Sequence, residues 1–317
     1  MMEERFFGNE RTPAMTLQII LSQTVSREVI TKGWSSDKKY KIITADGTPY
    51  LLRISASETY DAKKTEFEMM QKTAEKGIPM CTPIAFGLTE EGVCSVQKWI
   101  DGEDLEAVLP SMSEEEQYRL GYDAGVYLTG IHTIPAPDGI EEWETHFNRK
   151  IDRKLRMYAD CPLKYEGGDA FVDYLSSHRH LLCDRVQTFH HGDYHTGNMM
   201  LDSDGNLVII DFNRADFGDP WEEFNRIVWC VQLSSAFASG MVDGYFSDDV
   251  PTQFWELLAL YICSNTLSSL PWAIPFGEEE IQTMRHQAAE VLFWYDNMQR
   301  VIPMWYHSRT AERKASE

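Results

Sequence analysis

The spacing of apolar residues divides this 317-residue chain into two parts of different structural class. Short runs of β-branched and aromatic residues, typical of strands, occupy residues 27–33, 39–44, 49–54, 82–87 and 93–99. A helical segment with one apolar face lies among them at 61–76, and beyond them the spacing is mainly helical. The pattern predicts an α+β protein with an antiparallel-sheet domain at 1–100 and a helical domain at 101–317.

Charge is unevenly distributed along the chain. The whole sequence carries 29 Lys and Arg against 50 Asp and Glu, a net charge of −21. Residues 1–100 hold 13 charges of each sign, so the remaining 16 basic and 37 acidic residues account for all of the excess. Such a field repels nucleic acids and anionic lipids and attracts cationic ligands. We therefore expect no nucleic-acid or membrane partner, and a solvated acidic surface for many of the carboxylates.

Cellular location is predicted from apolar runs and cysteines. The longest uninterrupted apolar run is seven residues, 257–263, against the roughly 20 that cross a bilayer. The N-terminus lacks the basic start and apolar core of a secretory signal. Six scattered cysteines without a Cys-x-x-Cys motif predict reduced thiols in a protein core. We therefore expect a cytoplasmic globular protein.

A loop and a predicted β-hairpin contain the strongest chemical signal. The loop carries Asp193 and Asn198, and the second strand of the hairpin ends in Asp211. With Asp204-Gly205 as a two-residue turn, paired residue numbers sum to 409, which places Asn198 opposite Asp211. Oxygen ligands without a thiolate favour Mg²⁺, completed by phosphate oxygens. With Asp193 as a base, this is the set that phosphoryl transfer requires.

These residues resemble a known family. The segment from His191 through Asn198, with Asp211 downstream, is similar to the aminoglycoside phosphotransferase and choline kinase branch of the protein-kinase-like fold. The resemblance implies two lobes, a small antiparallel-sheet N-terminal lobe with one helix and a large, mainly helical C-terminal lobe. It also implies ATP and Mg²⁺ as cofactors, Asp193 as the catalytic base, and Asn198 and Asp211 as metal ligands.

Further residues match the family's motifs in the expected order. Arg53 resembles the strand cation that contacts the α- and β-phosphates, and Glu66 resembles the helix glutamate that forms an ion pair with it. The end of the last predicted strand resembles the interlobe hinge, so the backbone of Gln97 and Trp99 is expected to read the adenine edge. Glu223 resembles the acidic residue that braces the catalytic loop.

Several features depart from the protein-kinase pattern. Residues 32–39 contain one glycine and no Gly-x-Gly-x-x-Gly, so they are only a weak phosphate-loop signal. No arginine stands between His191 and Asp193, Asn213 replaces the glycine of Asp-Phe-Gly, and no Ala-Pro-Glu segment follows. Activation-loop control is therefore not expected. The absence of a Walker motif from the sequence excludes a P-loop ATPase.

Two alternatives concern the same loop. His190, His191, Asp193 and His195 could instead ligate zinc in a hydrolase. The phosphotransferase interpretation also accounts for the strand cation, the helix glutamate and the hairpin residues, which the zinc interpretation does not. In the phosphotransferase interpretation, His191 packs under the loop and hydrogen-bonds backbone. A catalytically inactive relative that only binds nucleotide is the second alternative.

The acceptor is predicted to be a small, cationic molecule with a hydroxyl group. Aromatic residues that could cage an ammonium group, or simply belong to the core, are Trp272, Trp294, Tyr295, Trp305 and Tyr306. Acidic candidates for ammonium recognition are Asp243, Asp248, Asp249, Glu278, Glu279, Glu280 and Asp296. The sequence thus predicts phosphoryl transfer from ATP to an aminoglycoside, with choline, ethanolamine or a metabolic sugar as alternative acceptors. Resistance to an antibiotic does not follow from the fold.

Overall fold

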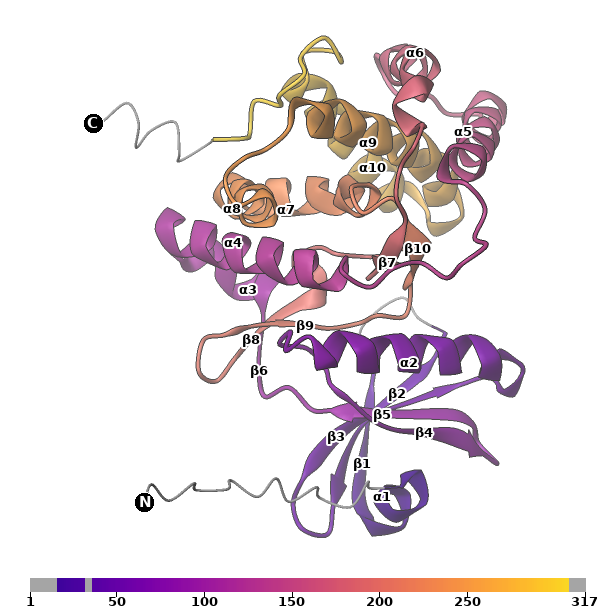
Figure 1. Cartoon of the computed structure of the whole chain (residues 1–317), viewed down its shortest axis with the longest axis vertical. Helices are drawn as coiled ribbons and strands as arrows, with labels where there is room; N and C mark the ends of the chain where they lie inside the picture. Colours follow the sequence, from indigo (N-terminus) through magenta and orange to yellow (C-terminus); the bar gives the residue numbers. More distant parts are fainter. Residues whose placement is uncertain (1–15, 32–35, 308–317) are drawn as a thin grey trace, which may run out of the picture. The chain divides into compact units, whose positions relative to one another are not determined.

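The computed structural model describes residues 16–31 and 36–307, which form two compact units (Figure 1). The first unit comprises the chain up to Gln71 together with Cys81–Trp99, and the second comprises Lys72–Met80 and the chain from Ile100 on. Residues 72–80 thus belong with the helical unit, unlike the predicted division at residue 100. The cause is backbone pairing, since Ile209 N–H donates to the Pro79 carbonyl at 2.9 Å.

The first unit is built on a five-stranded antiparallel sheet of order β1-β2-β3-β5-β4. Its strands are β1 (Thr24–Ile30), β2 (Lys38–Thr44), β3 (Pro49–Ser55), β4 (Pro83–Thr89) and β5 (Gly92–Lys98). The predicted β2–β3 hairpin is confirmed: Thr44 N–H donates to Thr48 O at 3.0 Å, and Gly47 supplies a φ of 87° in the turn. The predicted phosphate loop lies partly outside the described residues, at 32–35.

Two helices pack on opposite faces of this sheet. They are α1 (Leu17–Gln23) and, after the 3₁₀ turn η1 (Ser57–Thr59), α2 (Tyr60–Glu75). Leu17 and Ile20 of α1 form a buried cluster with Leu52 of β3. Because side chains alternate along a strand, Arg53 points to the other face, where its partners lie beside α2.

The second unit is mainly helical. Its α-helices are α3 (Leu105–Val108), α4 (Glu114–Ile131), α5 (Trp143–Asp160), α6 (Asp169–His178), α7 (Ile227–Leu233), α8 (Ser235–Phe246), α9 (Thr252–Ala273) and α10 (Glu278–Trp294). Its 3₁₀ turns are η2 (Leu109–Ser111), η3 (Arg179–Leu182), η4 (Thr196–Asn198), η5 (Glu222–Arg226) and η6 (Ile274–Phe276). The predicted capping box of Ser113 and Glu116 opens α4, which confirms that boundary.

Short strands connect these helices. A three-stranded sheet has the order β6-β8-β9, from β6 (Gly102–Asp104), β8 (Met199–Asp202) and β9 (Leu207–Ile209). A separate pair joins β7 (Thr188–His190) to β10 (Asp216–Gly218). Sequence analysis did not identify β6, β7 or β10, because three-residue strands are too short to show a period.

Helices α4 and α8 touch through glycines. A Cβ atom on Gly121 would lie 2.0 Å from the Phe237 carbonyl oxygen, and one on Gly244 would lie 2.1 Å from the Tyr122 carbonyl oxygen. Side chains at these positions would force the two backbones apart. This contact aligns α4 with α8, and Tyr194 of the predicted catalytic loop donates a hydrogen bond to Ala124 O of α4 at 2.7 Å.

Helix α9 is apolar around most of its circumference. The most apolar 18-residue stretch of Thr252–Phe276 has a mean hydropathy of 1.3, so by length and composition alone this segment could cross a membrane. Two-thirds (67%) of this 18-residue stretch is buried inside the protein, where α9 packs against α5, α6 and α10. A helix that is apolar on all sides is expected at the centre of a large domain, and this position explains its composition.

The six cysteines are free thiols. Cys81, Cys94, Cys161, Cys230 and Cys263 are buried, as predicted for core thiols. Cys183 is exposed, and this part of the prediction was wrong.

Candidate active site

The loop that carries Asp193 runs from β7 to η4 and is held by one buried carboxylate. Glu223 Oε2 accepts the His191 N–H and Glu223 Oε1 accepts the Gly192 N–H, each at 2.7 Å. Burial alone would raise the pKa of Glu223, but the hydrogen bond from His132 and the positive charge of His190 lower it to about 2. Glu223 is therefore ionised at neutral pH, and its predicted bracing role is confirmed.

His191 supports the same loop from below. It is fully buried, and its Nδ1 accepts the Asp193 N–H at 3.3 Å. The proton therefore lies on Nε2, which donates to the Ile210 carbonyl at 2.8 Å. Since both ring nitrogens bind backbone, His191 has the structural role that the phosphotransferase interpretation predicted.

Asp193 presents a partly exposed carboxylate surrounded by basic side chains. Its Oδ1 lies 3.1 Å from Arg226 Nε and 3.7 Å from His195 Nε2, and its Oδ2 lies 3.7 Å from Arg214 Nε. Burial and the charges of both arginines hold the pKa of His195 well below its usual range, although Asp193 opposes this shift. His195 is therefore neutral at neutral pH, and the two arginines supply the positive charge. Neither arginine was identified from the sequence.

Asn198 is tied to the Asp193 backbone. Its Nδ2 donates to the Asp193 carbonyl at 2.8 Å, which leaves Asn198 Oδ1 to act as an oxygen ligand. The Asn198 carbonyl accepts the Ile210 N–H at 3.0 Å. Asp211 follows directly, with a left-handed φ of 66° that ends the strand conformation.

The predicted register of this hairpin was wrong by one residue. Met199 pairs with Ile209, so paired residue numbers sum to 408 instead of 409, and Ile210, not Asp211, bonds to Asn198. The turn has three residues, because Asp202 N–H donates to Asn206 O at 3.0 Å across residues 203–205. The Asp202 carboxylate accepts the Asn206 N–H at 2.8 Å, and this side-chain contact favours the longer turn.

The zinc alternative is not supported. Among residues 16–31 and 36–307, no group of three or more His, Cys, Asp or Glu side chains is arranged to hold a metal ion. His191 uses both nitrogens on backbone, and His190 Nδ1 lies 3.4 Å from Asp216. His190 and His191 therefore act as structural groups.

Arg53 and Glu66, the charged residues predicted for the nucleotide site of the first unit, belong to a partly buried charge cluster. Arg53 is 4% exposed, and its Nη2 lies 3.2 Å from Asp37 Oδ2. Lys63 Nζ lies 3.3 Å from the same Asp37 oxygen and 2.8 Å from Glu66 Oε2. The direct Arg53–Glu66 ion pair that was predicted is thus replaced by a relay through Asp37 and Lys63. Lys63 on α2 reaches both carboxylates, and the sequence does not reveal this choice of partner.

Of the two predicted hinge residues, Gln97 lies near the end of β5 and Trp99 directly follows that strand. Gln97 is 2% exposed, and its Nε2 contacts Met70 Sδ of α2 at 3.8 Å. Lys41 Nζ lies 4.5 Å from the ring centroid of Trp99, the last residue of the first unit. Backbone recognition of adenine by Gln97 and Trp99 stays a prediction.

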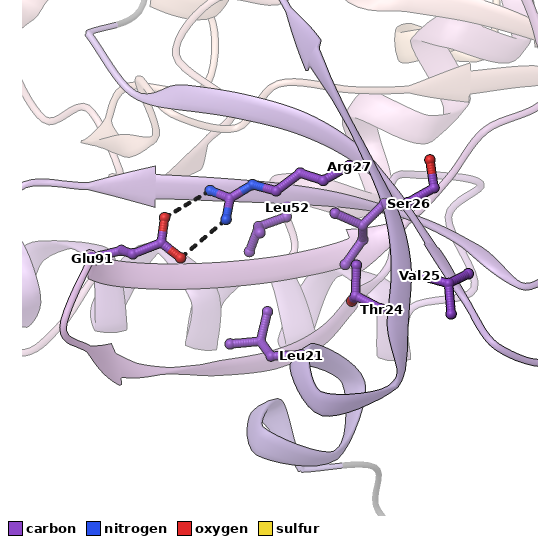
Figure 2. Close-up of a pocket in the computed structure, with 8 residues that line it drawn as sticks. Leu21, Thr24, Val25, Ser26, Arg27, Leu52 and Glu91 are labelled. Carbon is purple, nitrogen blue, oxygen red and sulfur yellow. Dashed lines mark hydrogen bonds and ion pairs between the residues drawn. The ribbon is translucent and has the colours of Figure 1, made fainter.

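A cavity in the first unit lies on the sheet face opposite Arg53. It has a volume of about 330 Å³ and is lined by Leu21, Leu52 and the start of β1. Figure 2 shows Arg27 and Glu91 joined across it by two hydrogen bonds, of 3.0 and 2.9 Å. None of the residues predicted to bind nucleotide lines this cavity.

The aromatic residues considered for an ammonium cage are mostly core. Trp294, Tyr295 and Trp305 are at most 8% exposed. Asp243, one of the acidic candidates, is fully buried and accepts hydrogen bonds from Tyr118 at 2.7 Å and Tyr306 at 2.5 Å. These contacts favour the structural interpretation of these residues over the ligand-binding one.

Solved structures with the same fold are recognisable at low sequence identity. Amicoumacin kinase hAmiN, in complex with AMP-PNP, Ca²⁺ and Ami, matches with a TM-score of 0.62 and 13% identity over 90% of this chain and 92% of that one. A thermostable mutant of aminoglycoside phosphotransferase APH(4)-Ia, with ADP and hygromycin B, gives 0.62 and 16% over 87% and 97%. A choline/ethanolamine kinase family protein from Mesorhizobium loti gives 0.61 and 14% over 86% and 90%. These similarities confirm the predicted protein-kinase-like fold.

Two sequence comparisons address the question of which protein family this chain belongs to. No curated protein matches the chain. The model described as "Phosphotransferase enzyme family" matches residues 26–256, which is more than half of the 317 residues. The chain therefore belongs to the phosphotransferase enzyme family and is a small-molecule phosphotransferase with a hydroxyl group as acceptor.

Proposed function

We propose that the protein transfers the γ-phosphoryl group of ATP, with Mg²⁺, to a hydroxyl group of a small molecule. The observation that carries this proposal is the anchoring of the Asp193 loop. Glu223 holds two amides of the loop, and Asn198 holds the Asp193 carbonyl. A carboxylate fixed in this way can orient a hydroxyl group without reorganisation during the reaction, and positioning is the main source of catalysis in phosphoryl transfer.

The proposed step is a direct transfer of the γ-phosphoryl group from ATP to the acceptor hydroxyl group. Asp193 accepts the proton of the acceptor hydroxyl while the hydroxyl oxygen bonds to the γ-phosphorus. The bond from the γ-phosphorus to the bridging oxygen breaks, and ADP leaves with that oxygen. Arg53 contacts the α- and β-phosphates, and the backbone of Gln97 and Trp99 reads adenine. Glu66 acts on Arg53 through Lys63 and Asp37.

Asn198 and Asp211 are the residues that would hold Mg²⁺. The chemistry of the donor set fits, because the Asn198 amide nitrogen donates to the Asp193 carbonyl and leaves the amide oxygen to act as a ligand, and Asp211 offers a carboxylate. When bound, Mg²⁺ neutralises charge on the phosphate oxygens. The Ca²⁺ and AMP-PNP in the hAmiN complex, and the ADP in the APH(4)-Ia complex, support a nucleotide and a divalent cation here.

Aminoglycosides are the first acceptor candidates, with choline, ethanolamine and sugars as alternatives. The net charge of −21 favours a cationic acceptor at long range, and the APH(4)-Ia complex contains hygromycin B. The proposed location is the cytoplasm, where ATP is available and free thiols persist.

A coupled assay of ADP release across these acceptor classes tests the function. We expect one class to stimulate release, and Asp193→Asn to lower kcat about 10³-fold with ATP affinity nearly unchanged. Asp173→Asn, an exposed change on α6, is the matched control. Retained turnover in Asp193→Asn would contradict the assigned base. ATP binding without transfer to any acceptor would instead indicate a nucleotide-binding regulatory protein.

A further inference from the structure

The immediate surroundings of Asp193 carry positive charge within an acidic part of the chain. Beyond residue 100 there are 37 acidic residues against 16 basic ones. Nevertheless, the charged side chains within 4 Å of the Asp193 carboxylate in the described residues are Arg214 and Arg226. Since acidic residues outnumber basic ones in this part of the chain, two arginines gathered at one carboxylate require an explanation.

Both arginines have unused hydrogen-bond donors. A guanidinium group carries five N–H donors in a planar fork. Within the described part of the chain, neither Arg214 nor Arg226 donates a hydrogen bond, and Arg226 Nε is buried without a partner in hydrogen-bonding geometry. Their side chains are 52% and 24% exposed, so a ligand can reach them. A fork of this shape matches a carboxylate or phosphate group.

A third basic residue, Lys154 of α5, is close enough to Arg226 for the charge of that arginine to act on it. It is 9% exposed and forms no ion pair or hydrogen bond with any residue of 16–31 or 36–307. Burial and the charges of Lys150 and Arg226 lower its pKa, Glu222 opposes them, and the result is about 7. An anion that binds beside Lys154 would favour the charged form of its amine.

The turn η5 connects these cations to Asp193. Glu222 begins the turn and its Oε1 accepts from Lys150 Nζ at 3.0 Å, while Arg226 ends the turn with its Nε 3.1 Å from Asp193 Oδ1. Lys154 lies one helical turn after Lys150 on the same side of α5. Lys154 is therefore expected on the side of α5 that faces η5, within electrostatic range of Glu222 and Arg226.

We propose that Arg214, Arg226 and Lys154 form an anion subsite for a carboxylate or phosphate substituent of the acceptor, next to the hydroxyl group that Asp193 orients. This inference rests on the proposed function and narrows the acceptor to a hydroxy acid, a zwitterion or a phosphorylated alcohol. An acceptor with an anionic substituent is thus an alternative to the purely cationic acceptors of the proposed function, and the turnover experiment below decides between them. Salt screens the charges of carboxylates that lie more than about 8–10 Å from the acceptor. The charged groups close to the acceptor therefore decide the electrostatic potential at its binding site.

Anion binding is measured first, without turnover. Inorganic phosphate and acetate are titrated calorimetrically into the protein saturated with ADP and Mg²⁺. We expect Lys154→Met and Arg226→Gln each to weaken phosphate binding about 10- to 100-fold, the loss of one charged hydrogen bond. Arg156→Met, an exposed change on the same helix, should leave it unchanged. Equal phosphate affinity in all four proteins would overturn the proposal. Arg226→Lys, which keeps the charge, provides a second variant if Arg226→Gln does not fold.

Turnover measurements then show whether the acceptor carries a carboxylate or a phosphate substituent. Glycerol, glycerate and glycerol 3-phosphate share hydroxyl groups and differ in the substituent, and ADP release is measured with each. We expect a preference in kcat/KM for one anionic member, and loss of that preference in Lys154→Met. Equal rates with all three, or a preference that survives Lys154→Met, would overturn the subsite. The subsite would also be overturned if Arg226→Gln lowered acceptor-independent ATP hydrolysis as much as it lowered transfer to the acceptor. The arginine would then act on the γ-phosphate. No turnover with any acceptor would contradict the proposed function, while the phosphate titration would still test the subsite.

Discussion

The carboxylate of Glu223 accepts the backbone N–H of Gly192 at 2.7 Å, so a side chain of η5 fixes the loop that carries Asp193. The other oxygen of the same carboxylate holds the His191 N–H, also at 2.7 Å. Two donors of one loop are thus satisfied by one ionised, buried group. The conformation of the Asp193 loop is therefore set from η5, 30 residues further along the chain.

Glu223→Gln should disrupt this arrangement. Glutamine has a single oxygen acceptor, so one loop amide would face an N–H group in a buried site. We expect the free energy of unfolding to fall by about 2 to 4 kcal/mol, measured by urea denaturation, and kcat to fall about 100-fold. Glu279→Gln, at an exposed position in α10, serves as the control. A variant with unchanged stability would show that the two hydrogen bonds contribute little.

Gly192→Ala tests the close approach of the loop to Arg214. Gly192 has a φ of 86°, and a Cβ atom there would lie 1.8 Å from the Arg214 carbonyl oxygen. The loop would have to move, so we expect kcat to fall at least about 100-fold. Gly205→Ala is a matched control, since φ is 79° and no atom lies within 4 Å. It should cost only about 1 to 2 kcal/mol of strain and leave kcat intact.

Gly121→Ala tests the contact between α4 and α8. Alanine favours helix by about 1 kcal/mol, but its Cβ would lie 2.0 Å from a backbone oxygen of Phe237. Overpacking should prevail and lower the free energy of unfolding by about 1 to 3 kcal/mol. Gly130→Ala, also on α4, meets only the flexible Ile78 side chain at 3.1 Å and should be tolerated. Equal effects on thermal unfolding would argue against a special contact at Gly121.

Lys63→Met tests the relay in the first unit. Lys63 lies between Asp37 and Glu66, at 3.3 and 2.8 Å. Burial already raises the pKa of Glu66, and removal of the ammonium group should raise it further. We expect the KM for ATP to increase about 10-fold as Arg53 loses its fixed position. Lys64→Met, which removes an exposed ion pair to Glu68 of 3.8 Å, should leave the KM unchanged.

The stability of the second unit should depend on pH through His190. Burial alone would lower the pKa of His190, but the hydrogen bond to Asp216 and the charges of Glu223 and Glu222 raise it to about 9. A folded-state pKa above the unfolded value of about 6.5 stabilises the protein fully below pH 6.5, and this stabilisation is lost as pH rises through 9. The loss should amount to about 3 kcal/mol, measured by urea denaturation between pH 6 and 9.

Asp216→Asn separates this effect from other titrations. It removes the partner of His190 at a residue whose side chain is 68% exposed, so the folded-state pKa of His190 should fall, and the loss of stability should be smaller and complete at a lower pH. Asp173→Asn should follow the wild-type curve. An NMR titration that finds His190 neutral at pH 7 would contradict the assignment.

Much of the fold was predictable because it depends on local pattern. The strands of the first unit, the α4 capping box and the β2–β3 turn follow from alternation, spacing and turn residues within a few positions. Register was less predictable: the side chain of Asp202 changes a two-residue turn into a three-residue one. Side-chain hydrogen bonds of this kind, from Asp204 N–H and Asn206 to the Asp202 carboxylate, shift every pair in the hairpin.

By itself the sequence determined the two-part architecture, the family motifs, and the loop in which Asp193 precedes Asn198 by five residues. Only the tertiary structure decided which charges meet. It exchanged the Arg53–Glu66 pair for a relay through Lys63, and it brought Arg226 to Asp193 and placed Lys154 of α5 nearby. The physical reason is that a charge can pair with any opposite charge along the chain, and the packing of elements distant in sequence selects the partner.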